Sequence, residues 1–589
     1  MSFEQYYQDE LAYLREMGAE FADAYPKLAP FLAQKGQDPD VERLLEGFAF
    51  MSGKIRQKLD DELPELTHNL HTLLWPNYLR PIPAMSILKF SSINNAITEK
   101  KCIKRGVEVD SVPVDGTVCR FRTCYDVNLY PMSISGISLN GRGSSSEIKI
   151  KFKLDSGVNF RQLKLDSLRL FLYGDMKSSF TLYQYLCRYL ANVKVNPLSG
   201  ADVTGAGQGF SLNADSVSPV GFSDDEALFP YPQNAFSGYR LLQDYFSFPH
   251  KYLFIDINGL NALACFENTN EFEIVFEFNR RLDEFVRIND SSLLMNCTPI
   301  VNLFSMDADP IRLRHEKSEY NVRPSNPEQS HYEIYSINSV TGWKYGGREK
   351  IQYQAFVSFD NSIDVDRRKS NYYQIRVKPS VVGQGADTYI SFILPGNAET
   401  FDRQPSTISL ELTCTNRSLP EKLKAGDITV ATGTSPEYTT FKNIFPATPS
   451  TPAPIKKDLH WQLISNMSLN YQSLADISAL RVILSTYNFQ ANFNRQSARA
   501  HELKMQGLVS IRQEPCTMLI KGLPVRGNKT ILDMKSGKFS SEGEMFLFTT
   551  VLSEFLSMYA NINSFSQLVI RDQDMGEEYQ WPIKTGLQA

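Results

Sequence analysis

The first part of the chain carries two long runs of helical apolar periodicity, whereas most of the remaining chain reads as short strands. In the first run, apolar positions recur at alternating steps of four and three residues, which places them on one face of a helix. These positions are Tyr7, Leu11, Leu14, Gly18, Phe21 and Tyr25. Pro26 comes directly after them, and because proline cannot continue a helix we expect the first helix to end there.

A second helix is predicted to begin near residue 40. Asp38 can cap it and Pro39 can occupy its first position. Its apolar stripe consists of Val41, Leu44, Leu45, Phe48, Met51, Ile55 and Leu59. Pro64 should break or kink the run. Leucines continue the pattern beyond it as far as Trp75, so the run is predicted to form two helices that meet at an angle.

The far side of the second helix carries Gly47, Phe50 and Gly53. A glycine inside a helix costs about 1 kcal/mol relative to alanine, so two of them indicate that something packs closely there. The two helices predict a candidate partner surface made of Tyr7, Leu11, Leu14, Phe21, Leu44, Phe48, Phe50, Ile55 and Leu59. The same pattern also fits a helix buried within its own domain, because the two kinds of stripe look alike in a sequence.

Beyond residue 83 the pattern changes to a period of two residues, broken by Gly, Pro and Asn. Runs such as 148–154 and 168–173 alternate apolar and polar positions, which is typical of antiparallel sheets. Near the end of the chain, Ser541 and Glu544 form a capping box. An apolar stripe of Met545, Phe548, Leu552, Phe555, Leu556 and Tyr559 comes after it and predicts a helix.

The predicted fold class is a multidomain α+β protein with a helical stem, a β-rich middle of antiparallel sheets and an α+β C-terminal domain. A segment rich in Thr and Pro is expected to form an extended linker. The predicted parts are a helical stem over 1–83, a β-rich domain over 84–257 with a loop insertion at 196–228, a second β-rich domain over 258–445, the Thr/Pro linker at 446–455, and the α+β domain over 456–589.

Charge and cysteine usage restrict the possible classes of function. The 589-residue chain has 61 basic and 66 acidic residues and a net charge of −5, without a long basic run, so nucleic acid is not expected as a main partner. Its eight cysteines include no CxxC pair, which favours free thiols in a reducing compartment. Neither a secretory signal nor a membrane-spanning apolar run is evident, so a cytoplasmic location is expected.

No motif predicts catalysis or a cofactor. His68 and His71 lie one helical turn apart, but no spacing supplies further metal ligands, so a structural role is favoured. The stretch 315–319 resembles half of a zinc-protease motif, yet its second ligand would be glutamate and its flanks alternate like a strand. The segment Gly205–Gly209 lacks the third glycine of a dinucleotide loop. We therefore expect no catalytic residue, no metal and no cofactor.

Four separated blocks carry a resemblance to a known family. They are YYQDELAYLR at 6–15, YPKL at 25–28, VERLLEGFAF at 41–50 and LRPIPAMS at 79–86. Further matching stretches are MNCTPIVNLF at 295–304 and LTCTNR at 412–417. Together they closely resemble the TssF family, also called ImpG or VasA, whose members are baseplate subunits of the bacterial type VI secretion system. The resemblance runs, with gaps, over essentially the whole chain.

The resemblance implies a structural role with specific partners. Two TssF copies would join one TssG in a wedge, and six wedges would surround the VgrG spike hub to nucleate the sheath and tube. TssK would tether the wedge to the membrane complex at the inner membrane, and TssE would link it to the sheath. Contractile phage baseplates share this wedge plan, in which the helical stem would supply bundle helices. No nucleic acid and no small-molecule substrate is implied.

Two alternatives from other classes of protein stay open. One is a β-rich cytoplasmic enzyme acting on carbohydrates, whose catalytic acidic residues could not be recognised from a single sequence. A secreted adhesin of stacked β-domains is the other alternative. The unpaired cysteines and the absence of a signal peptide count against the adhesin. The lack of any nucleophile, metal or phosphate motif counts against the enzyme.

Overall fold

The chain divides into two compact units. Unit 1 comprises Met1–Leu79 with Lys456–Trp461, and unit 2 comprises Arg80–Ile455 with Gln462–Ala589. The computed structural model describes residues 3–24, 40, 43–56, 72, 75–93, 96–142, 145–198, 209–232, 236–266, 269–313, 317–344, 350–356, 371–380, 385–393, 406–453, 476–520, 522–560 and 563–586.

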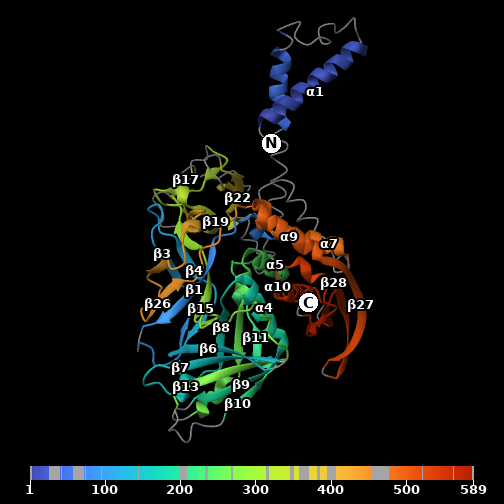
Figure 1. Ribbon diagram of the computed structural model, residues 1–589. Coiled ribbons are helices and arrows are strands. Elements are labelled where there is room, and N and C mark those ends of the chain that lie inside the picture. Colours follow the sequence, from blue (N-terminus) through green and yellow to red (C-terminus); the bar gives the residue numbers. More distant parts are fainter. Residues whose placement is uncertain are drawn as a thin grey trace. The chain divides into compact units, whose positions relative to one another are not determined.

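Unit 1 is helical in the parts that the structure describes. Helix α1 spans Phe3–Ala24, in agreement with the predicted helix, and Pro26 lies outside the described residues (Figure 1). A second helix runs over residues 43–56, and a short 3-10 helix, η1, lies at Pro76–Leu79. The kink predicted at Pro64 lies outside the described residues, as do Leu59, His68 and His71.

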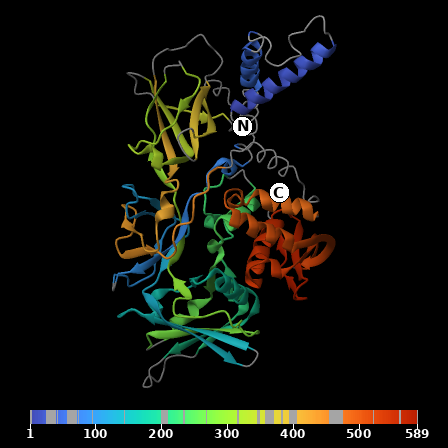
Figure 2. The ribbon, with the colours of Figure 1, turned by 45° about the horizontal axis from the view of Figure 1, so that its top comes forward.

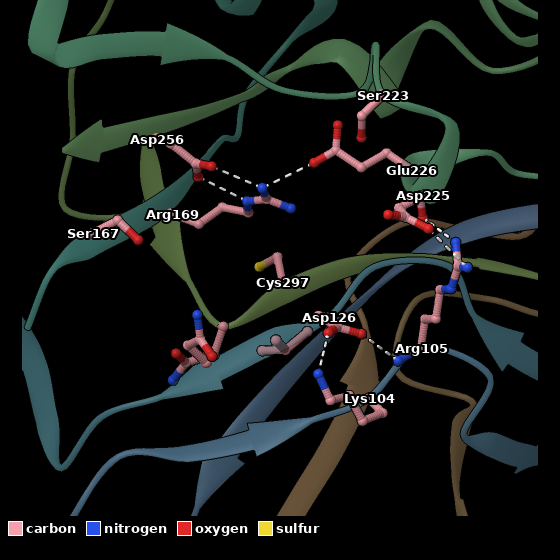
Figure 3. A pocket seen from close by; sticks show the side chains of 13 residues that line it. Lys104, Arg105, Asp126, Ser167, Arg169, Ser223, Asp225, Glu226, Asp256 and Cys297 are labelled. Atoms are coloured by element: carbon pink, nitrogen blue, oxygen red, sulfur yellow. Dashed lines mark hydrogen bonds and ion pairs between the residues drawn. The ribbon is translucent and has the colours of Figure 1, made fainter.

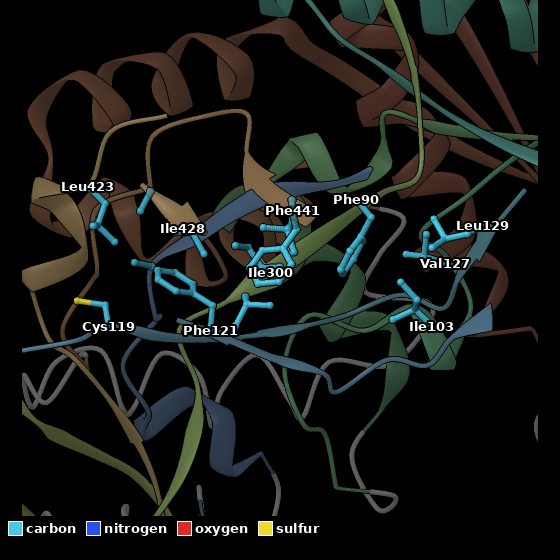
Figure 4. Close-up of a cluster of buried hydrophobic side chains, with 14 of the residues drawn as sticks. Phe90, Ile103, Cys119, Phe121, Val127, Leu129, Ile300, Leu423, Ile428 and Phe441 are labelled. Carbon is cyan, nitrogen blue, oxygen red and sulfur yellow. The ribbon is translucent and has the colours of Figure 1, made fainter. Parts of the chain in front are cut away.

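The first sheet of unit 2 has the strand order β25-β3-β4-β15-β1-β26. Its strands are β1 (Met85–Ser92), β3 (Glu108–Ser111), β4 (Arg120–Thr123), β15 (Cys297–Val301), β25 (Ile428–Ala431) and β26 (Thr439–Asn443). Inward-facing side chains such as Phe90, Phe121, Ile300 and Phe441 form its core, which is closed by the short pair β2 (Lys101–Ile103) and β5 (Val127–Leu129) (Figure 4). The chain meets itself here across more than 300 residues, because β1 pairs with both β15 and β26.

Two further sheets and several helices form the next part of unit 2. One sheet has the order β10-β9-β13-β7-β6 and the other β11-β12-β8-β14. Their strands are β6 (Met132–Arg142), β7 (Ser145–Leu154), β8 (Ser167–Leu172), β9 (Leu190–Leu198), β10 (Phe210–Asn213), β11 (Val217–Pro219), β12 (Phe254–Asn258), β13 (Glu271–Phe278) and β14 (Leu293–Met295). The helices are α3 (Phe160–Leu163), α4 (Met176–Gln184), which continues as a π-helical turn η2 (Tyr185–Tyr189), and α5 (Ser237–Ser247).

Residues 304–415 build a third β-structure, seen as the yellow strands in Figure 2. One sheet has the order β16-β24-β19-β20 with β17 on β24, and the other has the order β18-β23-β22-β21. Their strands are β16 (Phe304–Asp307), β17 (Ile311–Leu313), β18 (Tyr320–Asn321), β19 (Glu333–Lys344), β20 (Lys350–Gln352), β21 (Gln354–Ala355), β22 (Tyr372–Pro379), β23 (Ala386–Ile393) and β24 (Ser406–Thr415). Leu410, Leu412 and Ile390 lie in the core shared by the two sheets.

The last part of the chain combines helices with a sheet of order β27-β28-β29-β30, to which β31 adds on β29. The elements are α7 (Ile477–Thr486), α8 (Gln490–Phe493), α9 (Arg495–Gly507), β27 (Leu508–Ile520), β28 (Leu523–Met534), α10 (Glu542–Ser557), β29 (Ser564–Asp572), β30 (Glu578–Gln580) and β31 (Lys584–Thr585). Helix α10 begins where predicted, since the Ser541 side chain accepts a hydrogen bond from the Glu544 amide at 3.1 Å. It packs on α4, on α5 and on β29.

Three features of the expected domain organisation differ from the observed pairing of strands. The border at residue 257 does not separate two sheets, because β13 inserts between β7 and β9 and β15 lies beside β1. The expected loop at 196–228 contains β10 and β11, each of which pairs with a neighbouring strand. The Thr/Pro segment lies along the start of β1 in its described part, where Thr448 and Thr451 donate backbone hydrogen bonds to Met85 and Ile82. Long-range pairing of this kind leaves no mark in local composition.

Candidate functional site

The two helices of unit 1 pack through small and aromatic side chains. Tyr6 and Leu11 on α1 are buried, as are Ala49 and Gly53 on helix 43–56. A Cβ atom at Gly53 would lie 3.3 Å from the backbone nitrogen of Tyr7. The close packing expected at Gly53 is therefore present, and its partner is α1 of the same chain. A larger residue at this position would crowd the α1 backbone, because the two backbones approach closely.

Polar contacts hold the edge of this helix pair. Arg56 donates a hydrogen bond to the carboxylate of Glu10 at 2.8 Å, and the Ser52 hydroxyl donates another at 2.8 Å. These two hydrogen bonds lower the pKa of Glu10. The arrangement sets which side of helix 43–56 faces α1.

The opposite side of helix 43–56 carries a row of exposed apolar side chains. The row consists of Leu44, Phe48, Met51 and Ile55, whose side chains are 74%, 63%, 64% and 59% exposed. Their spacing of four, three and four residues places them on one face. Phe50 lies off this row, is 46% exposed, and has the Lys54 ammonium 5.4 Å from its ring centre. We refer to Leu44, Phe48, Met51 and Ile55 as the apolar row.

The nine residues of the predicted partner surface divide into three groups. Leu11 is buried, and Tyr7 and Leu14 are half-buried. The exposed group is Leu44, Phe48, Phe50 and Ile55. The side chain of Phe21 and all of Leu59 lie outside the described residues.

Two residues of the helix contact, Ala49 and Tyr6, are missing from the predicted surface although both belong to the packed face. The sequence signal for this contact is the pair of small residues at Ala49 and Gly53, which lie one turn apart and let another helix approach. The close packing expected at Gly47 is not found, since no atom of the described residues lies within 4 Å of where its Cβ would stand.

Unit 2 contains a polar pocket of about 460 Å³ (Figure 3). Arg169 reaches across it and donates hydrogen bonds to Asp256 at 2.7 and 2.8 Å and to Glu226 at 2.9 Å. The nearby Lys104 binds Asp126 at 2.8 Å, and Arg105 binds Asp225 at 3.0 Å. Every charged group that lines the pocket is thus engaged by a neighbour of opposite sign. Such a network holds strands together rather than moving protons.

The Cys297 thiol in this pocket is not activated. Burial raises the pKa of Cys297 to about 12, so the thiol stays protonated and is a poor nucleophile at neutral pH. Within the described ranges, no group of His, Cys, Asp and Glu side chains has a geometry that could hold a metal ion. No helix in these ranges is long and apolar enough to cross a membrane.

Comparison with known proteins gives the family. The family model described as "Type VI secretion system, TssF" matches residues 1–588. The type VI secretion system component TssF1 of Pseudomonas aeruginosa is 30% identical over an alignment of 635 positions, which covers 99% of this chain and 98% of that protein.

Solved structures agree with this match. A chain of the type VI secretion TssK-TssF-TssG baseplate subcomplex, determined by cryo-electron microscopy, superposes with a TM-score of 0.75 at 29% identity, covering 92% of this chain and 99% of the other. A chain of the baseplate complex from the type VI secretion system superposes with a TM-score of 0.62 at 26% identity over the full length of both. With agreement in sequence and in fold along nearly its whole length, this chain belongs to the TssF family of the type VI secretion system.

Proposed function

We propose that this chain is a structural subunit of the type VI secretion baseplate and that the apolar row on helix 43–56 binds a TssG-type partner. The observation that carries the proposal is the exposure of four large apolar side chains in a single line, between 59% and 74% each. Full burial of one such side chain contributes about 1.5 to 3 kcal/mol. Burial of the apolar row by a partner is therefore strongly favourable, and a monomer in water does not gain this stabilisation.

The packing of unit 1 suits this role. Ala49 and Gly53 hold one side of helix 43–56 against α1, so the row on the other side is presented on a supported helix. In this proposal the α1 residues of the predicted surface support helix 43–56, with Leu11 as the buried anchor. On α1, Tyr13 and Met17 are also exposed, at 57% and 45%.

The wider assembly rests on the relatives. The solved subcomplex that this chain resembles is one of TssK, TssF and TssG. We extend the proposal to TssG and TssK as direct neighbours on that ground. A second copy of this chain, TssE and the VgrG hub, together with docking at the inner membrane from the cytoplasm and the likeness to phage wedge proteins, are inferred from the family resemblance alone.

The test is a double substitution, Phe48→Asp with Ile55→Asp, in the full-length chain co-expressed with a tagged TssG from the same gene cluster. Because both side chains are exposed, the variant should keep its circular dichroism spectrum and its proteolysis pattern. Placing two carboxylates in an apolar interface should weaken capture by TssG by roughly a hundredfold or more.

A matched control separates surface from helix effects. Lys54→Asp introduces the same residue into the same helix but off the apolar row, and it should leave capture close to that of the wild type. A folded double variant that still binds TssG would refute the interface. Loss of fold in the double variant would instead show that the row packs inside the chain.

A further inference from the structure

A second pocket, of about 640 Å³, lies between strand β4 and the start of helix α5, within unit 2. Arg105, Arg122 and Arg240 line it together with the acidic residue Asp224. The remaining wall includes the exposed Pro230, the half-buried Tyr231, Pro232 and Phe236, and the buried Phe229. The pocket thus combines an excess of positive charge with flat apolar surfaces.

The three arginines are compensated to different degrees. Arg105 is paired with Asp225 at 3.0 Å. Arg240 is only 3% exposed, binds the carbonyls of Ser223 and Phe222 at 2.7 and 2.9 Å, and is paired with Asp224 at 3.0 Å. Its Nε atom is buried without a hydrogen-bond partner among the described residues. The guanidinium of Arg240 is therefore fixed in place as a positive wall of the pocket.

Arg122 differs from the other two arginines. It is half-buried on β4, and it makes no ion pair and no side-chain hydrogen bond with any residue that the structure describes. Its cross-strand neighbour Glu108 lies instead 3.6 Å from Arg120. A half-buried guanidinium with five unused donors beside two other arginines favours an anion in the space in front of it.

The start of helix α5 adds positive electrostatic potential to the pocket. Ser237 is the first residue of this helix and lines the pocket, and the N-cap residue Phe236 offers no side-chain acceptor to the first turn. The positive end of a helix favours negative charge. Arg122 and the start of α5 therefore both favour an anionic group in this pocket.

We propose that this pocket binds an acidic segment of a partner protein, with a side-chain carboxylate on Arg122 and an aromatic side chain against the half-buried Tyr231, Pro232 and Phe236. Charge complementarity calls for a carboxylate or phosphate, because a planar guanidinium binds such groups in a bidentate manner. The aromatic and prolyl wall favours a peptide over a small inorganic anion, which would leave that surface in water. The proposal is independent of the apolar row, which lies in unit 1.

The test uses the full-length chain and short capped model peptides in isothermal titration calorimetry. The probe is Gly-Asp-Phe-Glu-Gly, and its matched control is the uncharged isostere Gly-Asn-Phe-Gln-Gly. We expect binding of the acidic peptide only, weakening as salt rises because the contact is electrostatic. Arg122→Gln should weaken it about tenfold, since a charged hydrogen-bonded pair contributes on that order. Arg122→Lys keeps the charge and should lose less.

The control protein is Arg312→Gln, which removes an exposed arginine on β17 and should bind the acidic peptide as the wild type does. Equal binding of the two peptides, or unchanged affinity in Arg122→Gln, would overturn the proposal. Inorganic phosphate is titrated as a third probe. If phosphate binds as tightly as the acidic peptide, the site takes small anions and the assignment to a protein segment fails.

Discussion

Helix 43–56 and helix α10 carry similar apolar stripes in the sequence, but the stripe is exposed in helix 43–56 and buried in α10. In α10 the residues from Gly543 to Ser553 are all buried, and so are Phe555 and Leu556. In helix 43–56 only Ala49 and Gly53 are buried among the described residues, and the four side chains of the apolar row are exposed. Apolar periodicity therefore predicts a helix and its apolar face, but not the partner of that face.

The difference comes from the surroundings of each helix. Helix α10 packs against α4, α5 and strand β29, so that side chains on most sides of the helix are buried. Helix 43–56 has α1 on one side, and its buried residues, Ala49 and Gly53, are small. A helix that is apolar nearly all round is a core helix, whereas one with small residues on one side and large apolar residues on the other has surfaces for two neighbours. Matched substitutions in the two helices test this contrast.

The largest contrast is expected between two glycines. At Gly543 a Cβ atom would lie 2.3 Å from the carbonyl carbon of Phe180, so Gly543→Ala must push α10 away from α4. We expect a loss of at least about 3 kcal/mol in the free energy of unfolding. At Gly47 a Cβ meets no described atom within 4 Å, and Gly47→Ala should gain up to about 1 kcal/mol. Urea unfolding of both variants measures these changes. Equal unfolding midpoints for the two variants would contradict the expected difference between the two helices.

Truncating one apolar side chain in each helix gives the next effect. Leu552 is fully buried in α10, and Leu552→Ala should cost about 2 to 5 kcal/mol. Ile55 is 59% exposed, and Ile55→Ala should stay within about 0.5 kcal/mol of the wild type in the isolated chain. Thermal unfolding of the two variants compares them directly. A large loss in Ile55→Ala would mean that the apolar row is covered within the chain.

A pH effect is expected in unit 2. Burial lowers the pKa of His250 to about 4, and its ring centre lies 5.0 Å from that of Phe248 and 4.9 Å from that of Phe445. Between pH 6.5 and 4 the unfolded chain binds a proton at this site and the folded chain does not. The free energy of unfolding should therefore fall on acidification, by up to about 1.4 kcal/mol per pH unit.

The substitution His250→Phe isolates this contribution. It keeps the aromatic packing and removes the titration, and it also removes a buried Nδ1 atom that has no hydrogen-bond partner in the described part of the chain. The difference in unfolding free energy between variant and wild type should grow steadily as the pH falls from 6.5 to 4. A difference that does not change with pH would show that the His250 ring titrates normally.

The smallest expected effect concerns Phe50, which lies off the apolar row. If partner helices contact more than one side of helix 43–56, Phe50→Ala should weaken capture by TssG by less than about tenfold, because the side chain is only partly exposed at the outset. Its fold should be unchanged. Lys54→Ala serves as the control for losing the cation–π contact alone. Unaltered capture in Phe50→Ala would restrict the interface to the row.

The sequence alone determined the local features of this protein. The steps of four and three residues predicted α1 and helix 43–56, Ser541 and Glu544 located the start of α10, and period-two runs indicated antiparallel sheets. The four blocks in the first 86 residues also indicated the TssF family, which the comparisons bear out. These features are encoded by residues close together in the chain, where capping and side-chain periodicity act.

Only the tertiary structure decided how distant segments combine. It placed β1 between β15 and β26, which come more than 200 and 300 residues later in the chain, and so joined regions that the sequence assigned to separate domains. It also left Arg122 without an ion pair among the described residues and showed that the side chains of the apolar row are exposed. Strand pairing and burial depend on which surfaces meet in space. The free energy of such contacts depends on residues far apart in the chain, so no short stretch of sequence predicts it.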